Sequence, residues 1–294
     1  MWRKGILVAV CLGGLLMASF FVFSKTEESP PAIYLGLSVP QSGSSVSDFS
    51  SLASRYGARV SLFSFKVAWE HAFPKTDAAL CLNMGALPFL TWLIGEDNYV
   101  FEDILSGLWD DYFRQWALEA KAFSYPFLLR IQWVSGPEDE QLSAYNYIWS
   151  LFQSEGAVNV LWQVSLSESD LVKSRLESSW WKQSYPEAMR IDGVMINLEE
   201  RGVSMTMHRA QQLAEGIAGL PTSVSQKPVV IADWPPILSQ ASLDVFLEAL
   251  SGPLKASHAV MLSPSQNLAI DQMDAVFSHS LFFDDVHNFS ELTD

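Results

Sequence analysis

The side chains of this chain best suited to chemistry are charged residues at the ends of apolar, strand-like runs. Arg130 and Asp233 carry charges inside such runs, and the acids at 138–140 and at 199–200 follow two of them. Paired carboxyl groups can cleave a glycosidic bond, one as acid/base and the other as nucleophile. However, acids in loops are more often solvated surface charges. The run that contains Arg130 ends in Val134, which cannot transfer a proton.

Tryptophans occupy the same runs. An indole can bury the flat CH face of a sugar ring, while polar groups at the rim bind the hydroxyls. For any single tryptophan, packing is the more common role, but four at strand ends favour a carbohydrate-binding cleft. The predicted substrate-binding tryptophans are Trp69, Trp92, Trp133 and Trp234 at strand ends, with Trp162 in the middle of its strand.

The elements that must position these residues form a regular alternation. Apolar runs alternate with amphipathic segments, among them 101–124, which predicts one long helix. Eight such units in about 260 residues predict an α/β (β/α)8 TIM barrel, with its site at the carboxyl ends of the strands. The near-continuous apolar runs are typical of parallel strands buried on both faces. An open, doubly wound sheet is the alternative, but the chain has no Gly-rich phosphate turn. The predicted strands are Ala32–Val39, Ala58–Trp69, Ala86–Leu93, Tyr125–Val134, Asn159–Leu166, Ile191–Glu200, Lys227–Trp234 and His258–Ser265.

The N-terminus predicts a membrane anchor. Gly5–Phe23 is a charge-free apolar run of 19 residues, about the length needed to cross a ~30 Å hydrocarbon layer. Arg3 and Lys4 precede it, so the positive-inside bias places the N-terminus in the cytoplasm. A cleaved signal peptide is the alternative, but the run exceeds the usual ~7–15 residue apolar region and no A-x-A site follows. We predict a cytoplasmic N-terminus at 1–4, a transmembrane helix at 5–23, a tether at 24–32 and a barrel with an acidic tail at 33–294. The expected location is the bacterial inner membrane, in a single pass, with the barrel in the periplasm or outside.

Composition excludes several classes of function. The chain has 33 acidic and 18 basic residues, a formal net charge of −15, which disfavours binding to nucleic acid or to anionic lipid. Cys11 lies in the predicted membrane span and Cys81 in the barrel, so they cannot pair with each other. We expect Cys81 to be a buried small hydrophobe and not a catalytic thiol. No histidine or cysteine has metal-ligand spacing, so we expect no metal and no cofactor.

Several segments, in order, resemble glycoside hydrolase family 26, the β-mannanase family. "ILSGLWDDYFRQWALEAKAFSYPFLLR" resembles the family's I-x-x-G-x-x-D-x-Y-x-x-x-W-A, which is followed by an Arg-bearing fourth strand. "KPVVIADW" resembles its seventh strand, K-P-x-x-I-x-E-F-G. The family's third strand is similar to "ALPFLTW", and its helix and fifth strand are similar to "YNYIWSLFQSEGAVNVLW". Its segment Y-Y-P-G-D-x-Y-V-D-W-V-G is similar to "SYPEAMRIDGV". The resemblance covers residues 33 to about 265.

The resemblance implies a retaining TIM-barrel glycosidase with two catalytic glutamates. Carried over by position, the family's arginine falls on Arg130, and its strand-three proline and tryptophan fall on Pro88 and Trp92. Its His-Glu acid/base step falls on Trp133–Val134, and its nucleophile falls on Asp233. Both catalytic positions therefore depart from the family.

These departures predict that hydrolysis is inefficient. Loss of a general acid typically lowers the rate by about 10²–10⁴. Asp233 is one methylene shorter than Glu, which retracts its oxygens by ~1 Å and can cost about a hundredfold. We therefore expect an inactive barrel that binds or guides a β-linked polysaccharide beside a membrane-embedded polysaccharide synthase or export complex. Two alternatives stay open: an active β-1,4-glycan glycosidase that uses Asp233 and a displaced acid from 138–140, and a structural subunit of a membrane complex with a vestigial cleft. For Asp192, near the start of a strand, we expect a structural pair with an arginine.

Overall fold

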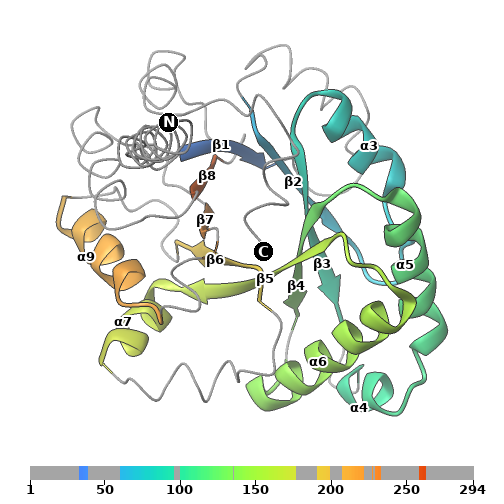
Figure 1. Ribbon diagram of the computed structural model, residues 1–294. Helices are drawn as coiled ribbons and strands as arrows, with labels where there is room; N and C mark the ends of the chain where they lie inside the picture. Colours follow the sequence, from blue (N-terminus) through green and yellow to red (C-terminus); the bar gives the residue numbers. More distant parts are fainter. Residues whose placement is uncertain are drawn as a thin grey trace, which may run out of the picture. The chain divides into compact units, whose positions relative to one another are not determined.

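Eight parallel strands pair in chain order and close into a barrel, because the last strand pairs with the first (Figure 1). The computed structural model describes residues 33–38, 60–95, 100–134, 136–176, 191–198, 207–221, 227, 229–232 and 258–262. The strands are β1 Ile33–Ser38, β2 Leu62–Val67, β3 Leu87–Ile94, β4 Phe127–Trp133, β5 Val160–Ser167, β6 Gly193–Asn197, β7 Val229–Ala232 and β8 His258–Leu262. The predicted (β/α) barrel is confirmed.

The chain divides into two compact units, 1–30 and 31–294, and all described residues belong to the second. The predicted transmembrane helix at Gly5–Phe23 lies outside the described residues. Among the helices that the structure does describe, none has the length and apolar character needed to cross a membrane.

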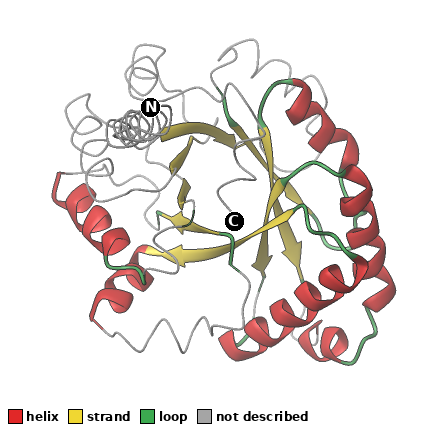
Figure 2. Cartoon of the chain, in the orientation of Figure 1, coloured by secondary structure: helices red, strands yellow, loops and turns green. Residues whose placement is uncertain are grey.

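The described helices lie outside the ring of strands (Figure 2). They are α3 Lys75–Asn83, α4 Val100–Leu105, α5 Asp110–Phe123, α6 Glu138–Glu155, α7 Glu168–Leu176 and α9 Met207–Ala218. The single helix predicted at 101–124 is wrong, since α4 and α5 are separate helices. Gly107 lies between them with φ +85°, a left-handed conformation that an α-helix cannot include.

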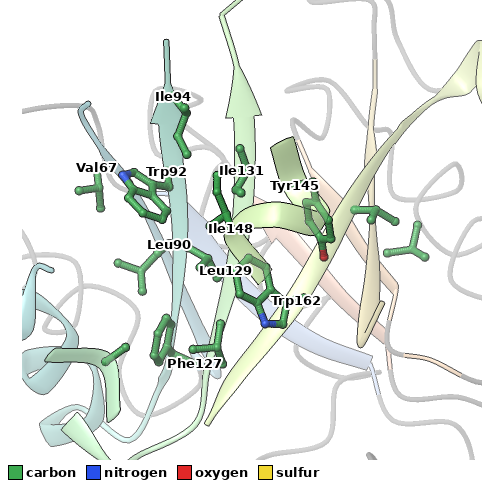
Figure 3. Close-up of a cluster of buried hydrophobic side chains, with 14 of the residues drawn as sticks. Val67, Leu90, Trp92, Ile94, Phe127, Leu129, Ile131, Tyr145, Ile148 and Trp162 are labelled. Atoms are coloured by element: carbon green, nitrogen blue, oxygen red, sulfur yellow. The ribbon is translucent and has the colours of Figure 1, made fainter. Parts of the chain in front are cut away.

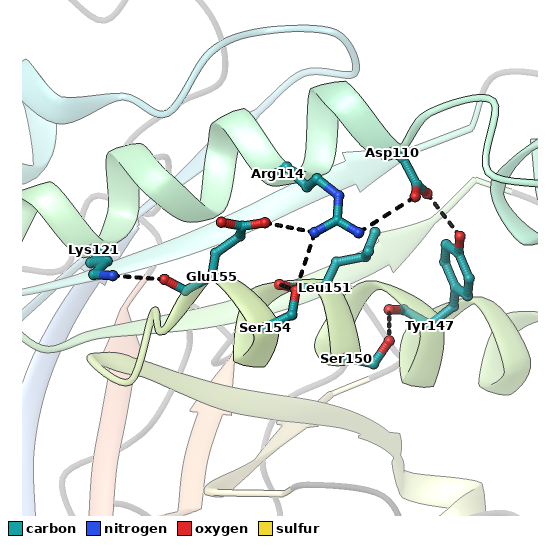
Figure 4. Close-up of polar contacts among 8 residues, drawn as sticks. All are labelled: Asp110, Arg114, Lys121, Tyr147, Ser150, Leu151, Ser154 and Glu155. Atoms are coloured by element: carbon teal, nitrogen blue, oxygen red, sulfur yellow. Dashed lines mark hydrogen bonds and ion pairs between the residues drawn. The ribbon is translucent and has the colours of Figure 1, made fainter.

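Polar side chains join α5 to α6 along their exposed edge (Figure 4). Arg114 Nη1 donates to Glu155 Oε1 at 2.6 Å, and Tyr147 OH donates to Asp110 Oδ1 at 2.8 Å. The bond to a carboxylate is the largest cause that raises the pKa of the Tyr147 phenol. Lys121 Nζ donates to the Glu155 carbonyl at 2.9 Å, which satisfies an otherwise unpaired acceptor at the end of α6.

Side chains of successive strand residues point to opposite faces, and this alternation separates the core into two clusters. One set fills the barrel interior and contains Leu62, Leu87, Phe89, Leu128, Leu161, Met195, Val230 and Ala232. The residues between them in sequence pack outward against the helices, as Leu90, Leu129 and Ile131 do (Figure 3). The interior cluster is apolar, so any polar inward-facing residue stands out as a candidate for function.

Candidate functional site

Arg130 points into the barrel. Its neighbours on β4, Leu129 and Ile131, belong to the outward-facing cluster, so alternation places the guanidinium on the inner face. Two residues earlier, Leu128 belongs to the apolar interior cluster. Arg130 is only 7% exposed. It therefore lies directly above the apolar interior, towards the carboxyl ends of the strands.

The Arg130 guanidinium binds three polar side chains from two neighbouring strands and its own. Its Nη1 donates to Asn197 Oδ1 at 3.1 Å and to Ser165 Oγ at 3.4 Å. Its Nη2 donates to Gln132 Oε1 at 3.1 Å. Ser165 lies on β5 and Asn197 ends β6, so one planar fork joins three strands of the barrel. These amide and hydroxyl groups suit the recognition of sugar hydroxyls.

Two further inward-facing polar residues continue this layer. Thr91 on β3 is the Cα partner of Arg130 and also of Lys66 on β2. Lys66 lies between Phe65 and Val67, which are in the outward-facing cluster, and it is exposed. Lys66 is not among the predicted site residues, although strict alternation within Ala58–Trp69 places it on the same face as Leu62. Gln132, Ser165 and Asn197 were also missed, because an uncharged polar residue in an apolar run gives little signal.

Val134 follows β4 directly, at the mouth of the barrel. Its backbone N–H donates to the Ile94 carbonyl at 3.3 Å, which extends the pairing with β3 by one residue. Its side chain is 57% exposed. The residue that the resemblance aligns with the acid/base is therefore an exposed aliphatic side chain beside the polar layer.

The acids at 138–140 form the first turn of α6, and all three are exposed. Pro137 precedes the helix and provides no side-chain cap. Negative charge in this turn interacts favourably with the unpaired N–H groups there, by about 0.3–1 kcal/mol for each residue. Their position thus has a local structural explanation. Whether one of them replaces the missing acid stays a prediction, because Asp233 lies outside the described residues, as do Trp234 and the acids at 199–200.

Trp92 and Trp162 do not face the barrel mouth, so the predicted contact of these two residues with sugar is wrong. They are 0% and 1% exposed and lie in the layer between strands and helices (Figure 3). Trp92 stacks on Trp116 of α5, with ring centroids 4.0 Å apart and planes at 12°. Trp162 packs edge-on against Phe152 of α6 at 5.2 Å. A sugar cannot reach an indole that is covered on both sides by protein.

Trp69 and Trp133 lie at the carboxyl ends of their strands and are partly buried. Trp69 packs edge-on against Trp109 at 4.8 Å, and Trp133 contacts Phe101 of α4 at 5.1 Å. Each therefore has a packing partner in the helix layer and keeps some exposed surface. Contact between these two residues and sugar stays a prediction.

Asp192 lies at the opposite, amino end of β6 and is 2% exposed. Its Oδ2 accepts from the backbone N–H of Trp162 at 3.0 Å, and its own backbone N–H donates to the Trp162 carbonyl at 2.8 Å. These bonds join β5 to β6 far from the mouth. They support the structural role expected for this residue, through backbone groups of the neighbouring strand.

Cys81 is fully buried in α3, as expected for a small hydrophobe. Burial, and secondarily the charge of Asp77, raises the pKa of its thiol well above the ordinary range, so the thiolate that a nucleophile needs is disfavoured. Within the described ranges, no three potential metal-ligating side chains gather.

No protein-family model and no curated protein sequence matches this chain. Its structure is similar to the GH26 β-mannanase BoMan26A from Bacteroides ovatus, with a TM-score of 0.59 and 15% identity over 91% of this chain and 94% of that one. It is also similar to GH26C from a Muricauda species, with a TM-score of 0.60 and 14% identity over 88% and 89% of the two chains. SleL, a spore cortex-lytic enzyme from Bacillus megaterium, has a TM-score of 0.56 at 9% identity, over 85% and 74%. At these identities the likeness shows the fold alone, a (β/α)8 barrel similar to those of these enzymes.

Proposed function

We propose that this protein is a membrane-anchored, exported glycoside-hydrolase-like barrel that binds a β-linked polysaccharide without cleaving it. The observation that carries the proposal is Val134, an exposed aliphatic residue at the strand end where the resemblance expects the acid/base. A barrel that lacks this proton donor loses about 10²–10⁴ in rate. The substitution of Asp for Glu at 233 removes about a hundredfold more.

The binding half of the proposal rests on the layer around Arg130. A hydrolase site that had lost all function would have no need for a buried arginine, which is unfavourable inside a barrel unless it is hydrogen bonded. Here Arg130 is bonded to Asn197, Ser165 and Gln132, whose amide and hydroxyl groups are of the kind that bind sugar hydroxyls. The structural likeness to a β-mannanase makes a β-linked glycan the natural ligand to test.

The accessory half of the proposal rests on the N-terminus. An apolar run of 19 residues after Arg3 and Lys4 supports a single-pass anchor with the barrel on the outer side. A barrel held there would meet a polysaccharide as it leaves a membrane-embedded synthase or export complex. We propose that it guides or holds the nascent chain.

Two measurements on the full chain in detergent test the proposal. Mannohexaose and cellohexaose are incubated with the protein and assayed for new reducing ends, and their binding is followed by calorimetry. We expect binding without turnover. Arg130→Met should abolish binding, since Met fills similar volume without hydrogen-bond donors. Lys121→Gln, which removes one positive charge from the outer face of α5, should leave binding unchanged. Thermal unfolding shows whether each variant is folded.

The alternatives give different results in the same assays. Release of reducing ends that Asp233→Ala abolishes would establish an active glycosidase with a displaced acid and refute the inactive barrel. Neither binding nor turnover with either sugar, together with co-purification of a membrane partner through residues 1–31, would instead establish a structural subunit.

A further inference from the structure

Lys66 is the exposed residue of an otherwise buried strand. The other five residues of β2 are buried, and the flanking Phe65 and Val67 pack outward against the helix layer. Alternation therefore directs the Lys66 side chain to the inner face. An inward-facing side chain can be exposed only if the mouth of the barrel is open to solvent at this point. Lys66 thus lies at the entrance of the proposed sugar cleft.

Lys66 and Arg130 both face the inside of the barrel, on strands on either side of β3. Both are Cα partners of Thr91, on opposite sides of β3. Because neighbouring strands are about 4.8 Å apart, the two Cα atoms are roughly 10 Å apart. That separation is comparable to the length of two β-linked sugar units, since one unit spans about 5 Å, similar to one strand spacing. The layer can therefore contact successive units of one glycan chain.

The inner face of the described strands carries positive charge and polar groups but no carboxylate. Besides Lys66 and Arg130, its polar residues are neutral; they include Ser38, Ser64, Thr91, Gln132, Gln163, Ser165, Ser167 and Asn197. Lys66 forms no ion pair or hydrogen bond with any residue that the structure describes. The chain as a whole has a net charge of −15, so a lysine at this position is contrary to the overall composition.

We propose that Lys66 binds an anionic group of the polysaccharide, a uronate carboxylate or a sulfate ester, and that the ligand is therefore an acidic β-linked polysaccharide. This inference rests on the proposed function, since it concerns the same cleft. The acidic surface does not prevent it, because charges separated by more than ~8 Å are largely screened at physiological ionic strength. The charge at the mouth then decides which glycan is accepted. An ammonium group on a flexible stem can reach such an anion as a point charge.

Three matched probes test the inference on the full chain: mannohexaose, the corresponding β-1,4-linked hexamannuronate, and sulfated mannohexaose. At low salt we expect at least one acidic probe to bind about fivefold tighter than the neutral one, as expected for a single exposed ion pair. The preference should disappear at 1 M salt, where the Debye length is ~3 Å. Lys66→Gln should remove the preference, so that the acidic and neutral probes bind this variant with similar affinity. Lys227→Gln is the matched control, since Lys227 precedes β7 at the opposite end of the barrel.

The outcomes separate this inference from the proposed function. Preference for hexamannuronate or for the sulfated probe supports the inference and identifies the anion. Equal binding of all three probes, or a preference that persists in Lys66→Gln, overturns it and leaves the polysaccharide-binding function standing. Failure of all three to bind overturns the proposed function, and the inference falls with it. Unfolding temperatures within about 2 °C of the wild type, a shift that corresponds to no more than about 1 kcal/mol in a domain of this size, show that the variants are folded.

Discussion

Replacement of Trp92 distinguishes a sugar-binding tryptophan from one that stabilises the barrel. In the structure, Trp92 is fully buried, stacks on Trp116 at 4.0 Å and donates from Nε1 to Tyr112 OH at 3.3 Å. Tyr112 OH in turn donates to the His71 carbonyl at 3.0 Å. The indole therefore connects β3 to α5 and to the loop that follows β2.

The magnitude follows from these contacts. Truncation of a buried aromatic residue to Ala costs about 3–5 kcal/mol, which is a large part of the roughly 5–15 kcal/mol that holds a domain folded. Trp92→Phe is the milder change. It keeps an aromatic ring against Trp116 but loses a hydrogen bond worth about 0.5–1.5 kcal/mol and part of the buried area. We expect Trp92→Phe to lower the free energy of unfolding by about 1–3 kcal/mol.

Denaturant unfolding of the full chain, followed by circular dichroism, measures this change. Val158→Ala is the control, because Val158 is 80% exposed and a surface substitution should change stability by less than about 0.5 kcal/mol. Mannohexaose binding by folded Trp92→Phe should match that of the wild type within about twofold, since a destabilised but folded variant keeps its cleft. If Trp92→Phe has unchanged stability but binds mannohexaose tenfold or more weakly, the reasoning is refuted and Trp92 contacts the sugar.

Two further predictions concern Gly136 and Cys81. Gly136 has φ +114° and an added Cβ would overlap the buried Phe101 ring, so Gly136→Ala should destabilise by about 2–4 kcal/mol through strain and overpacking. Gly107→Ala, where φ is +85° but the nearest atom is 3.5 Å away, should cost only about 1 kcal/mol in the same denaturant assay; equal effects at the two glycines would contradict this reasoning. In the native protein, Cys81 should resist alkylation by iodoacetamide at pH 8. The free energy of unfolding should fall as pH rises above about 8.5, because the thiol ionises there in the unfolded chain but not in the folded one. Peptide mass spectrometry measures the alkylation of Cys81 by iodoacetamide, with the protein unfolded in guanidinium as the labelled control. Rapid modification of Cys81 in the native protein would show that the thiol is accessible and contradict the prediction.

The sequence predicts the order of elements well because alternation of apolar and amphipathic segments is a local property. It correctly predicts eight strands and an arginine within the fourth. It fails between 101 and 124, where the apolar period of 3.6 continues across Gly107 although the helix does not. A 3.6-residue period of apolar residues indicates which residues of a helix are buried. Two short helices that pack on the same surface give the same pattern as one long helix.

The mouth of the barrel is predictable only in part. Arg130 can be identified as a candidate site residue from the sequence, because a charged residue within an apolar run is rare. Lys66 lies within a similar run and was missed, and neutral partners such as Asn197 and Gln132 become significant only when strands β4, β5 and β6 bring them to one guanidinium. Such convergence depends on the register between strands, which no single segment specifies.

The sequence by itself determined the repeating unit of this protein, the acidic balance of its surface and the aliphatic residue at the end of the fourth strand. Only the tertiary structure decided which way the tryptophans point. A strand buried on both faces is apolar at every position, so its sequence does not distinguish the interior of the barrel from the layer beneath the helices. Trp92 and Trp162 fit a cleft by residue type and by place in the chain, but the pleat turns both towards α5 and α6, where they stabilise the barrel.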